Sequence, residues 1–399
     1  MTEVYADTFE EAIAAWEEVR GEEANWGEFR VHVTRSLKWY VESSLRDAVS
    51  RKIGVSWYAR SDGRTGYRNG SYIRTLVTPY GTVDVEVPRL REGSYEHALW
   101  DKNGLLTPDA RELVLETYLA GVSTRRTGEV LERVLGYKVS PTTVSAICKG
   151  LDRLVRQYWR REIGDQWRYL LLDGVVMKSR AALGAERRVV LVALGISLTG
   201  KREILSFKQV ESESEVCWTS FVEDLARRGL EGKNLELMTT DGNGALIAAV
   251  EAMWPSVTRQ RCWVHKLANM GAKMKRCNQK SCLGEAKLIY LAESRAEAIR
   301  RFRLWRAKWK EVEPKAVACL ESDLQEMLEF FFVAKKDRVR MRTTNPIERV
   351  FREVRRRTRT ISCFTNRRSV DRMVYAVLAY QNRKWDGAHR PPADFTHKA

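Results

Sequence analysis

Three acidic side chains, far apart along the chain, have the sequence surroundings of metal ligands. Asp173 follows the apolar run 169–172, Asp241 comes just after the apolar run 235–239, and a glycine follows each aspartate. Glu348 opens a stretch in which six of the next eleven residues are arginine. A carboxylate among so many positive charges is needed only if it binds a cation or pairs with the arginines. Hard divalent cations prefer carboxylate oxygens, so these residues predict a metal site.

The chemistry that this site predicts is cleavage or transfer of a phosphodiester. Two Mg²⁺ or Mn²⁺ ions about 4 Å apart can clamp the entering and leaving oxygens of such a reaction. Asp173, Asp241 and Glu348 are then the catalytic residues and the ligands of two ions per active site. No side-chain nucleophile is required, because water or a 3′-hydroxyl attacks in line. Taken alone, each motif has an ordinary alternative: an Asp-Gly turn, or a glutamate in a surface ion pair.

The arginines beside Glu348 predict a contact with phosphates. Arg352 and Arg355 lie four and seven residues after Glu348, on the same face of the helix that this stretch predicts. The alternative is a solvated charged face with no partner. The other predicted DNA-binding residues in this part of the chain are Arg342, Arg349, Arg356 and Arg359.

Cys262 and His265 form a Cys-x2-His pair, and Cys277 and Cys282 follow at spacings that a zinc site permits. Against zinc, residues 265–276 read as one continuous helix, and residues 278–281 offer little geometry for closing a cage. We therefore predict that Cys262 and His265 support the active site, with His265 near Asp241.

The elements that must position these residues read as a mixed α/β sheet. Strands are predicted at 169–173, 188–196, 203–207, 235–239 and 258–263, and helices at 214–228 and 245–253. Three successive strands followed by alternating helix and strand are the order of a ribonuclease-H-like core. The predicted core comprises residues 166–282 and, after an all-helical insertion at 283–340, residues 341–385, followed by a tail at 386–399.

The part of the chain before this core predicts DNA-binding elements. Residues 1–60 read as helical, and the spacing of the apolar residues Phe9, Ala12, Ala15 and Trp16 indicates the first part of this pattern. Residues 61–105 contain a β-hairpin that turns at Pro79-Tyr80-Gly81. Residues 106–165 read as helix, turn, helix, with Ser140-Pro141 as the start of the last helix. A helix-turn-helix inserts its last helix into the major groove, whereas the alternative is a plain helical bundle. The predicted contact residues on that helix are Thr142, Thr143 and Lys149.

Charge and composition favour a nucleic-acid partner. The 399 residues carry a net charge of +17, and residues 335–399 contain 18 Lys or Arg against 6 Asp or Glu. Residues 1–50 have the opposite balance, 5 against 11. Such polarity predicts an acidic partner for the C-terminal part, most simply a phosphate backbone. No apolar run approaches the roughly 20 residues of a membrane span, and the seven cysteines are an odd number without a regular framework. We expect a cytoplasmic, nucleoid-associated protein without a membrane partner.

Several motifs of this chain resemble those of the Mutator-type bacterial insertion-sequence transposases. The likeness covers residues 65–385 and includes the upstream segments 68–70 and 78–94. Two departures from the family pattern are Pro346, where a small residue is commoner, and Leu267-Ala268, where the family has an arginine. The motifs that carry the resemblance are Leu172-Asp173-Gly174-Val175, Thr240-Asp241-Gly242, the segment 260–266 with Asn269, and 343–349.

The resemblance implies a DDE transposase on a ribonuclease-H-like fold, with Asp173, Asp241 and Glu348 as metal ligands and an all-helical insertion before the glutamate. It also implies that Cys262 and His265 are the family's Cys-x2-His signature, which weakens the zinc hypothesis. By likeness, the partners are double-stranded DNA (terminal inverted repeats and target DNA) and further copies of the chain in a homodimer or higher assembly. The route that it implies is copying out through a circular intermediate.

The predicted function is therefore binding of terminal inverted repeats, metal-dependent cleavage of DNA 3′ ends and their transfer into target DNA. The helix-turn-helix and the hairpin are expected to recognise the ends. Two alternatives remain open: a structure-specific nuclease or resolvase on the same fold, and a catalytically silent DNA-binding regulator. The intact set of three carboxylates argues against the regulator.

Overall fold

The computed structural model describes residues 26–57, 59, 62–95, 97, 104–181, 184–359 and 366–387. The chain divides into two compact units, one of residues 1–150 with 392–399 and one of residues 151–391. The helix expected through Phe9 and Trp16 lies outside the described residues. No helix among the described residues combines the length and the apolar content that crossing a membrane requires.

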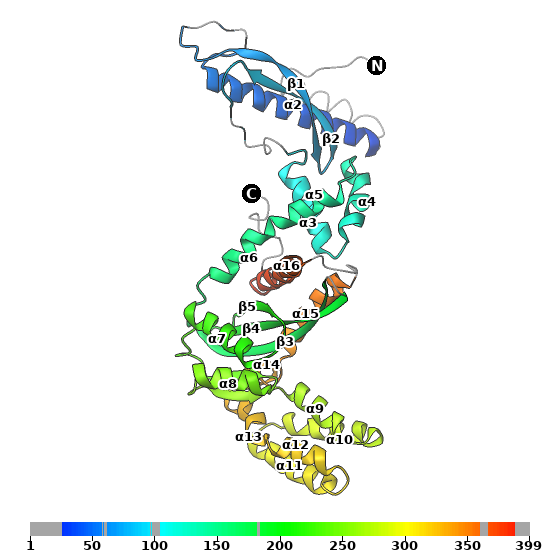
Figure 1. Ribbon diagram of the computed structural model, residues 1–399, viewed down its shortest axis with the longest axis vertical. Coiled ribbons are helices and arrows are strands. Elements are labelled where there is room, and N and C mark those ends of the chain that lie inside the picture. Colours follow the sequence, from blue (N-terminus) through cyan, green and yellow to red (C-terminus); the bar gives the residue numbers. More distant parts are fainter. Residues whose placement is uncertain are drawn as a thin grey trace. The chain divides into compact units, whose positions relative to one another are not determined.

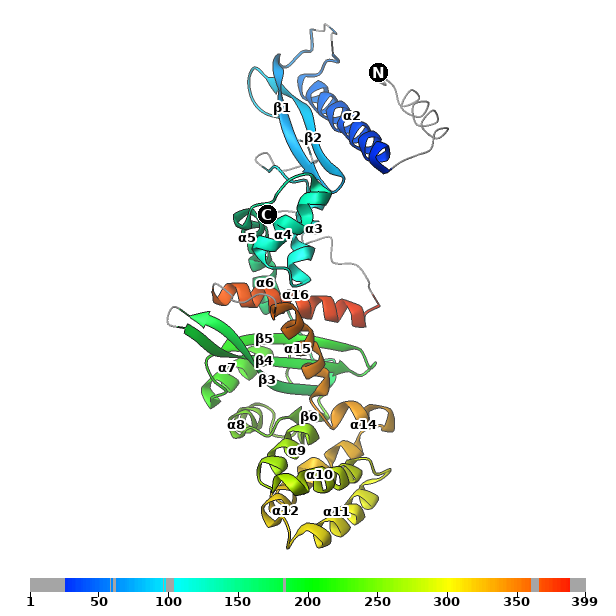
Figure 2. The ribbon, with the colours of Figure 1, turned by 90° about the vertical axis from the view of Figure 1, so that its right-hand side faces the viewer.

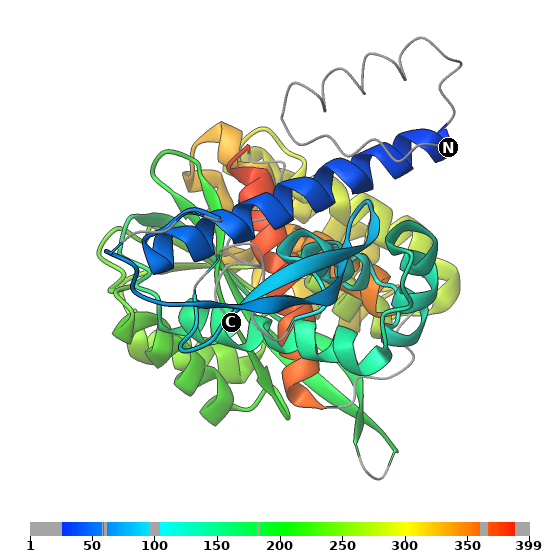
Figure 3. The same ribbon diagram turned by 90° about the horizontal axis from the view of Figure 1, so that it is seen from above.

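The first unit begins with a long helix packed on a hairpin (Figure 3). Helix α2 (Trp26–Ile53) lies against strands β1 (Arg68–Thr78) and β2 (Gly81–Leu90), which pair antiparallel. The closing pair is Thr78 with Gly81, as the hairpin prediction expects, and Gly81 has a φ of 134°. Alternate β2 side chains are buried, as expected for a sheet covered on one face. The core that they form contains Val41, Leu45, Leu76, Val83, Val85 and Val87.

Three short helices follow the hairpin, at the positions that the sequence predicts. They are α3 (Pro108–Leu119), α4 (Thr124–Leu135) and α5 (Pro141–Lys149). The N-cap residues are Thr107, Ser123 and Ser140, and the hydroxyl of each accepts a hydrogen bond from a backbone N–H in the first turn of its helix. Gly136, with a φ of 63°, ends α4 in the left-handed conformation that glycine tolerates.

The second unit is built on a mixed five-stranded sheet with the order β5-β4-β3-β6-β7 (Figure 1). Strands β3, β4 and β5 form an antiparallel meander, and β6 and β7 run parallel to β3. The α/β class that the sequence predicts is confirmed. The strands are β3 (Trp167–Ala181), β4 (Gly184–Ser197), β5 (Arg202–Val210), β6 (Leu237–Thr240) and β7 (Thr258–Arg261).

Helices cover both faces of this sheet (Figure 2). Helices α7 (Glu215–Arg227) and α8 (Gly244–Met253) pack on one face, where Leu170 and Leu172 meet Trp218 and Phe221 in a buried core. The opposite face carries α6 (Leu151–Arg160), α15 (Asn345–Thr358) and α16 (Arg367–Trp385). Helix α6, which the sequence analysis grouped with the helix-turn-helix, is bound to this unit by an ion pair between Asp152 and Arg372.

Between β7 and α15 the chain is helical from Trp263 to Met341. The expectation of one continuous helix over 265–276 is wrong, because α9 ends at Ala272 and α10 starts at Arg276. The helices of this segment are α9 (Trp263–Ala272), α10 (Arg276–Tyr290), α11 (Arg295–Trp309), α12 (Pro314–Glu321), α13 (Leu324–Met327), the 3-10 helix η1 (Glu329–Phe332) and α14 (Lys335–Met341).

Candidate active site

The parallel pairing of β3 with β6 brings the two aspartates to one level of the sheet. The last parallel pair joins Leu171 to Thr239, and Asp173 and Asp241 each lie two residues beyond it. Asp241 follows the end of β6, as predicted. Asp173 does not end its strand: β3 continues to Ala181, because β4 keeps pairing with it as far as Gly184. The expectation that Asp173 terminates a strand is therefore wrong.

Glu348 reaches the sheet because the segment before α15 is hydrogen-bonded to the ends of β6 and β7. The Thr239 hydroxyl donates to the carbonyl of Met341 over 2.6 Å, and the Trp263 N–H donates to the carbonyl of Arg342 over 3.0 Å. The backbone N–H and the hydroxyl of Thr344 both donate to Cys262 Sγ, at 3.3 Å and 3.4 Å. Glu348 then lies in the first turn of α15, where the helix dipole favours a carboxylate.

Asp173, His265 and Glu348 meet in one cluster. A carboxylate oxygen of each acid and a ring nitrogen of His265 all lie within 4.8 Å of one another. His265 Nε2 is 3.8 Å from Glu348 Oε1. Asp173 is buried, whereas His265 and Glu348 are partly exposed, so solvent reaches the cluster from the side of His265 and Glu348. Two carboxylates and an imidazole are ligands that a divalent ion can take.

The electrostatics of this cluster favour the binding of a cation. The pKa of Asp173 is raised to about 7, chiefly by burial and also by the charges of Asp241 and Glu348, against the opposing effects of His265 and Thr344. A positive ion would relieve this accumulation of negative charge. The imidazolium of His265 relieves part of it in the protein itself. Its pKa is raised to about 9, chiefly by a hydrogen bond to Cys262, against burial, and also by the charges of Cys262, Asp173 and Asp241.

Cys262 supports His265 from behind. Its thiol is buried, which would raise its pKa, but the hydrogen bonds from His265 and Thr344 outweigh burial and lower it. The backbone N–H of Cys262 donates to the carbonyl of Thr240 over 2.7 Å, which ties the start of α9 to the end of β6. Cys262 and His265 therefore both lie at the site, and a ring nitrogen of His265 is itself one of the possible ligand atoms of the cluster.

Asp241 lies beside the cluster but outside the group of ligand atoms within 4.8 Å of one another. Its charge acts on both Asp173 and His265, raising the pKa of each. The backbone N–H of Asn243 donates to Asp241 Oδ1 over 2.8 Å, which fixes one orientation of the carboxylate. The structure thus brings together two of the three predicted acids closely, with the third within electrostatic reach.

The two remaining candidates for a zinc site, Cys277 and Cys282, do not lie in the cluster that contains His265. Cys277 is exposed on α10, and Cys282 is buried on the same helix, where its backbone carbonyl accepts a hydrogen bond from Trp305 Nε1 over 3.1 Å. Among the described residues, the group of His, Cys, Asp and Glu side chains close enough to hold a metal is the Asp173, His265 and Glu348 cluster.

The predicted arginines of α15 differ in how far they are already paired. Arg352 and Arg355 are exposed and have no ion pair among the described residues, as is also true of Arg349 and Arg359. Arg356 is paired with Glu353, at 3.1 Å. Arg342 is partly buried, with its guanidinium 4.9 Å from the ring centre of Tyr290.

The predicted contact residues on α5 fall into two kinds. Thr142 and Lys149 are exposed, as a DNA contact requires. Thr143 is half-buried, and its hydroxyl lies 2.8 Å from that of the N-cap Ser140, so part of its hydrogen bonding is used within the helix start.

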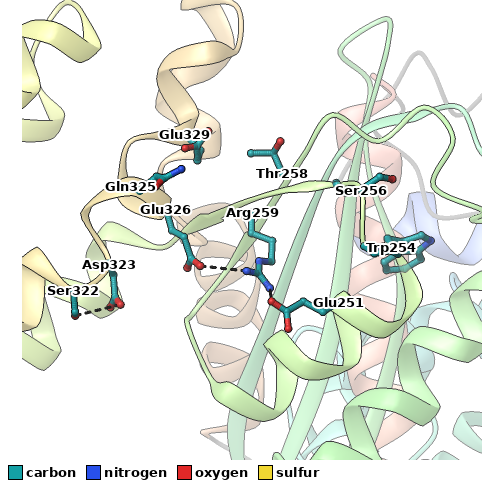
Figure 4. A pocket seen from close by; sticks show the side chains of 12 residues that line it. Glu251, Trp254, Ser256, Thr258, Arg259, Ser322, Asp323, Gln325, Glu326 and Glu329 are labelled. Carbon is teal, nitrogen blue, oxygen red and sulfur yellow. Dashed lines mark hydrogen bonds and ion pairs between the residues drawn. The ribbon is translucent and has the colours of Figure 1, made fainter.

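A separate pocket of about 530 Å³ lies at the edge strand β7 and contains none of the cluster residues (Figure 4). Figure 4 shows Arg259 between two acids of its lining, Glu251 and Glu326, with which it forms ion pairs. Asp323, also in the lining, pairs with Arg261 over 2.7 Å. These pairs join the sheet edge to α13 and its neighbours, so the pocket belongs to the attachment of the helical segment.

Two features of the site have no clear signal in the local sequence. The direct contact of His265 with Glu348 depends on a pairing between Trp263 and Arg342 that no local pattern indicates. Thr344, whose backbone N–H and hydroxyl both donate to Cys262 Sγ, is the second. The Thr343-Thr344 pair directly before a helix-starting Asn-Pro is a weak signal of the second, since hydroxyl residues commonly lie at helix starts.

Comparison with known proteins places the chain among transposases. The sequence model of "Transposase, Mutator family" matches residues 10–388. The chain is 35% identical over 354 residues to the transposase for insertion sequence element IS406 of Burkholderia multivorans, covering 88% of this chain and 90% of that one. It is 31% identical to the transposase for ISRM5 of Rhizobium meliloti, covering 89% of this chain and 88% of that one.

A third relative is the transposase for IS256 in transposon Tn4001 of Staphylococcus aureus, 31% identical over 393 residues that cover 92% of this chain and 99% of that one. Among solved structures, the simian T-cell lymphotropic virus intasome in complex with PP2A regulatory subunit B56 gamma has a chain with a TM-score of 0.17 and 10% identity, covering 57% of this chain and 70% of that one; a TM-score this low carries no argument about fold. The match to the family over almost the whole length shows that this chain belongs to the Mutator family of transposases.

Proposed function

We propose that this transposase binds the terminal inverted repeats of an insertion sequence, cleaves the 3′ ends and joins them to target DNA. The observation that carries the proposal is the meeting of Asp173, Glu348 and His265, with Asp241 alongside, at the start of helix α15, which exposes Arg349, Arg352 and Arg355. Acids that gather beside a positive helix suit a reaction on a polyanion.

We propose that the catalytic domain is ribonuclease-H-like, made of the core segments 166–282 and 341–385 around the helical segment. The support is the sheet order β5-β4-β3-β6-β7, in which an antiparallel meander is extended by two parallel strands. This order places the carboxylates of β3 and β6 at one level and lets α15 deliver a third from the side. The predicted boundaries 1–60, 61–105 and 386–399 complete the proposed domain map. For the predicted domain 106–165 we propose an end at Gly150, because α6 belongs to the second unit.

The residues that would hold Mg²⁺ or Mn²⁺ are Asp173, Asp241 and Glu348. Their oxygens are the ligands that such ions prefer, and the buried Asp173 is central to the set. His265 is a nitrogen donor, which suits these ions less well, and we assign it to orienting Glu348 and balancing charge. Two ions bound there would neutralise the scissile phosphate and lower the pKa of an attacking hydroxyl.

The chain itself contributes orientation and substrate binding. The hydrogen bonds from Thr344 to Cys262 Sγ hold the start of α15, and His265 Nε2 lies 3.8 Å from the Glu348 carboxylate. We propose that these contacts orient Glu348 toward Asp173. Arg352 and Arg355 would bind phosphates beside the acids, with Arg342, Arg349, Arg356 and Arg359 extending the contact. Thr142, Thr143 and Lys149 of α5 would face the terminal repeat.

Asp241→Asn tests this assignment. Incubated with labelled terminal-repeat DNA, target DNA and Mg²⁺, the native chain is expected to give both cleaved and joined products, and Asp241→Asn neither. The matched control is Glu236→Gln, a half-exposed acid just before the opposite end of β6 that pairs with Arg168. It is expected to keep both activities.

The same assay separates the alternatives. Cleavage without joining would indicate a nuclease or resolvase, and binding without cleavage a regulator. Joining that persists in Asp241→Asn would overturn the assignment of this residue. We propose that the active species is a homodimer or a higher assembly, because two DNA ends must be paired. We also propose that it acts in the cytoplasm, at the nucleoid.

A further inference from the structure

We propose that Glu213 is a positioning residue of the active site, which holds the Asp241 carboxylate in place through the side chain of Asn243. The inference rests on the proposed function, since Asp241 matters only if the site is catalytic. Glu213 lies between β5 and α7, directly before the N-cap Ser214, and no feature of the sequence singled it out.

The first link runs from Asp241 to Asn243. These residues form a tight turn at the end of β6, with Gly242 between them at a φ of 87°. The Asn243 backbone N–H donates to Asp241 Oδ1 over 2.8 Å. The orientation of the Asp241 carboxylate therefore follows the position of the Asn243 backbone.

The second link runs from Asn243 to Glu213. The Asn243 amide has two ends, and its Oδ1 accepts the Ala245 N–H over 2.9 Å to cap α8. The other end, Nδ2, donates to Glu213 Oε2 over 3.0 Å. With the cap alone, the amide could rotate with the helix start, whereas the bond to Glu213 attaches it to a different element, the start of α7.

The Glu213 carboxylate also lies against the strand that carries Asp173. Glu213 Oε1 occupies the space beside Gly174, where a Cβ would come within 2.6 Å of it. Gly174 follows Asp173 directly, and its missing side chain makes room for the Glu213 carboxylate. One carboxylate thus touches the strand of the first aspartate and the turn of the second.

Glu213 lies in a setting that disfavours its charge. The side chain is partly buried, and burial together with the charge of Asp241 raises its pKa, against the hydrogen bond from Asn243 and the charge of His265. Among the described residues, no Lys or Arg forms an ion pair with it. An acid kept in this setting is expected where its hydrogen bond orients a neighbour of a metal site.

Substitutions of Glu213 test the proposal in the end-cleavage assay. Glu213→Ala is expected to lower kcat by about 10- to 100-fold, the range for residues that orient metal ligands, with KM for the DNA unchanged. Glu213→Gln still accepts the hydrogen bond from Asn243 and is expected to rescue most of the activity. A Gln variant as impaired as the Ala variant would overturn a role based on this hydrogen bond.

Asn243→Ser provides an independent test, because serine also caps a helix but cannot reach Glu213. It is expected to match Glu213→Ala, and the double variant is expected to be no worse than either, since both substitutions break one chain of contacts. Additive losses would contradict the proposal. Gly174→Ala, which displaces the carboxylate, is likewise expected to cause a loss that Glu213→Ala does not deepen.

Two controls distinguish this proposal from the proposed function. Glu215→Ala removes an exposed acid two residues away and is expected to leave kcat unchanged. If the native chain cleaves and joins DNA but Glu213→Ala does so equally well, the positioning role is wrong and the function stands. If the native chain does neither, the proposed function is wrong. Unchanged thermal midpoints exclude unfolding as the cause, and a fall in the midpoint that accounts for the whole loss would contradict the proposal.

Discussion

Two arginines of α15 are the phosphate contacts that we propose beside the acid cluster. Arg352 and Arg355 follow Glu348 by four and seven residues, are exposed, and have no ion pair among the described residues. Two neighbouring arginines, Arg356 and Arg357, form ion pairs with Glu353 within the same helix. An exposed guanidinium near the proposed metal site suits a phosphate, which it can bind with two parallel hydrogen bonds.

We therefore expect Arg352→Ala and Arg355→Ala each to weaken binding of terminal-repeat and unrelated DNA alike. Each loss of a phosphate contact reduces the slope of log K against log salt by about 1. The measurement is a binding titration at several salt concentrations. Arg227→Ala, an exposed arginine of α7, is the control and should leave the slope unchanged. An unchanged slope in both α15 variants would exclude them as phosphate contacts.

A second residue-scale prediction concerns Asp371 at the start of α16. Burial raises its pKa to about 6, although Gln209 Nε2 donates a hydrogen bond to it. The folded chain then holds a proton that the unfolded chain releases at lower pH, so this residue makes the folded state less stable as pH rises from about 4 to 6. The loss is complete at neutral pH.

Asp371→Asn removes this titration while keeping an oxygen that accepts from Gln209. The substitution is expected to raise the free energy of unfolding relative to the native chain. This gain should be larger at pH 7 than at pH 4 by about 1–3 kcal/mol. Urea unfolding at both pH values measures the difference. Asp386→Asn, at a half-exposed surface pair with Lys201, should show none. An equal difference at both pH values would mean that Asp371 is not protonated in the folded chain.

At the scale of elements, the turn between α4 and α5 depends on a close approach of backbone to backbone. Gly128, within α4, faces the carbonyl oxygen of Val139, which a Cβ would meet at 2.1 Å. Gly128→Ala forces the two helices apart and is expected to destabilise the first unit by about 1–3 kcal/mol.

Urea unfolding followed by circular dichroism checks this prediction. The control is Val130→Ala on the same helix, a half-exposed position where the change should stay within about 0.5 kcal/mol. A Gly128→Ala variant as stable as the native chain would show that the segment around Val139 can move away freely. A parallel loss of repeat binding would support the reading of α4 and α5 as a DNA-binding pair.

What the sequence predicts well is local. The helices α3, α4 and α5 were predictable because Thr107, Ser123 and Ser140 cap them and Gly136 ends α4, all within a few residues. The hairpin was predictable from alternation and the turn before Gly81. The carboxylates were predictable as residue types, although their roles remain proposals.

What the sequence could not predict depends on distant partners. The continuation of β3 past Asp173 needs β4 beside it, and nothing in residues 174–181 shows that partner. The break between α9 and α10 lies in a stretch whose local pattern is helical. The place of His265 against Glu348 needs hydrogen bonds between segments about eighty residues apart, such as the one from Trp263 to Arg342. Long-range pairing, rather than local propensity, decides each of these.

At the scale of the whole molecule, the division after Gly150 separates the proposed recognition helices from the acid cluster. Each unit has its own buried core, which is the condition for folding alone. We therefore expect a fragment of residues 1–150 to fold and to bind terminal-repeat DNA. A fragment of residues 151–399 is expected to fold and to bind DNA without sequence preference.

Circular dichroism and competition binding with unrelated DNA measure both outcomes. The intact chain is the reference, and a 1–150 fragment carrying Lys149→Ala is the matched control, because this exposed residue is a predicted contact of α5. Sequence preference found in the 151–399 fragment instead would move recognition to the unit that carries α15.

The helical segment leaves the sheet and returns to it at the same point. Its first residue, Trp263, is hydrogen-bonded to Arg342, just past its last helix, and Thr239 of β6 holds Met341. Glu348 is thus placed by the junction and not by the path between its two ends. We therefore expect that the intervening helices can be lengthened, shortened or exchanged without moving Glu348, provided that the two ends of the segment still meet.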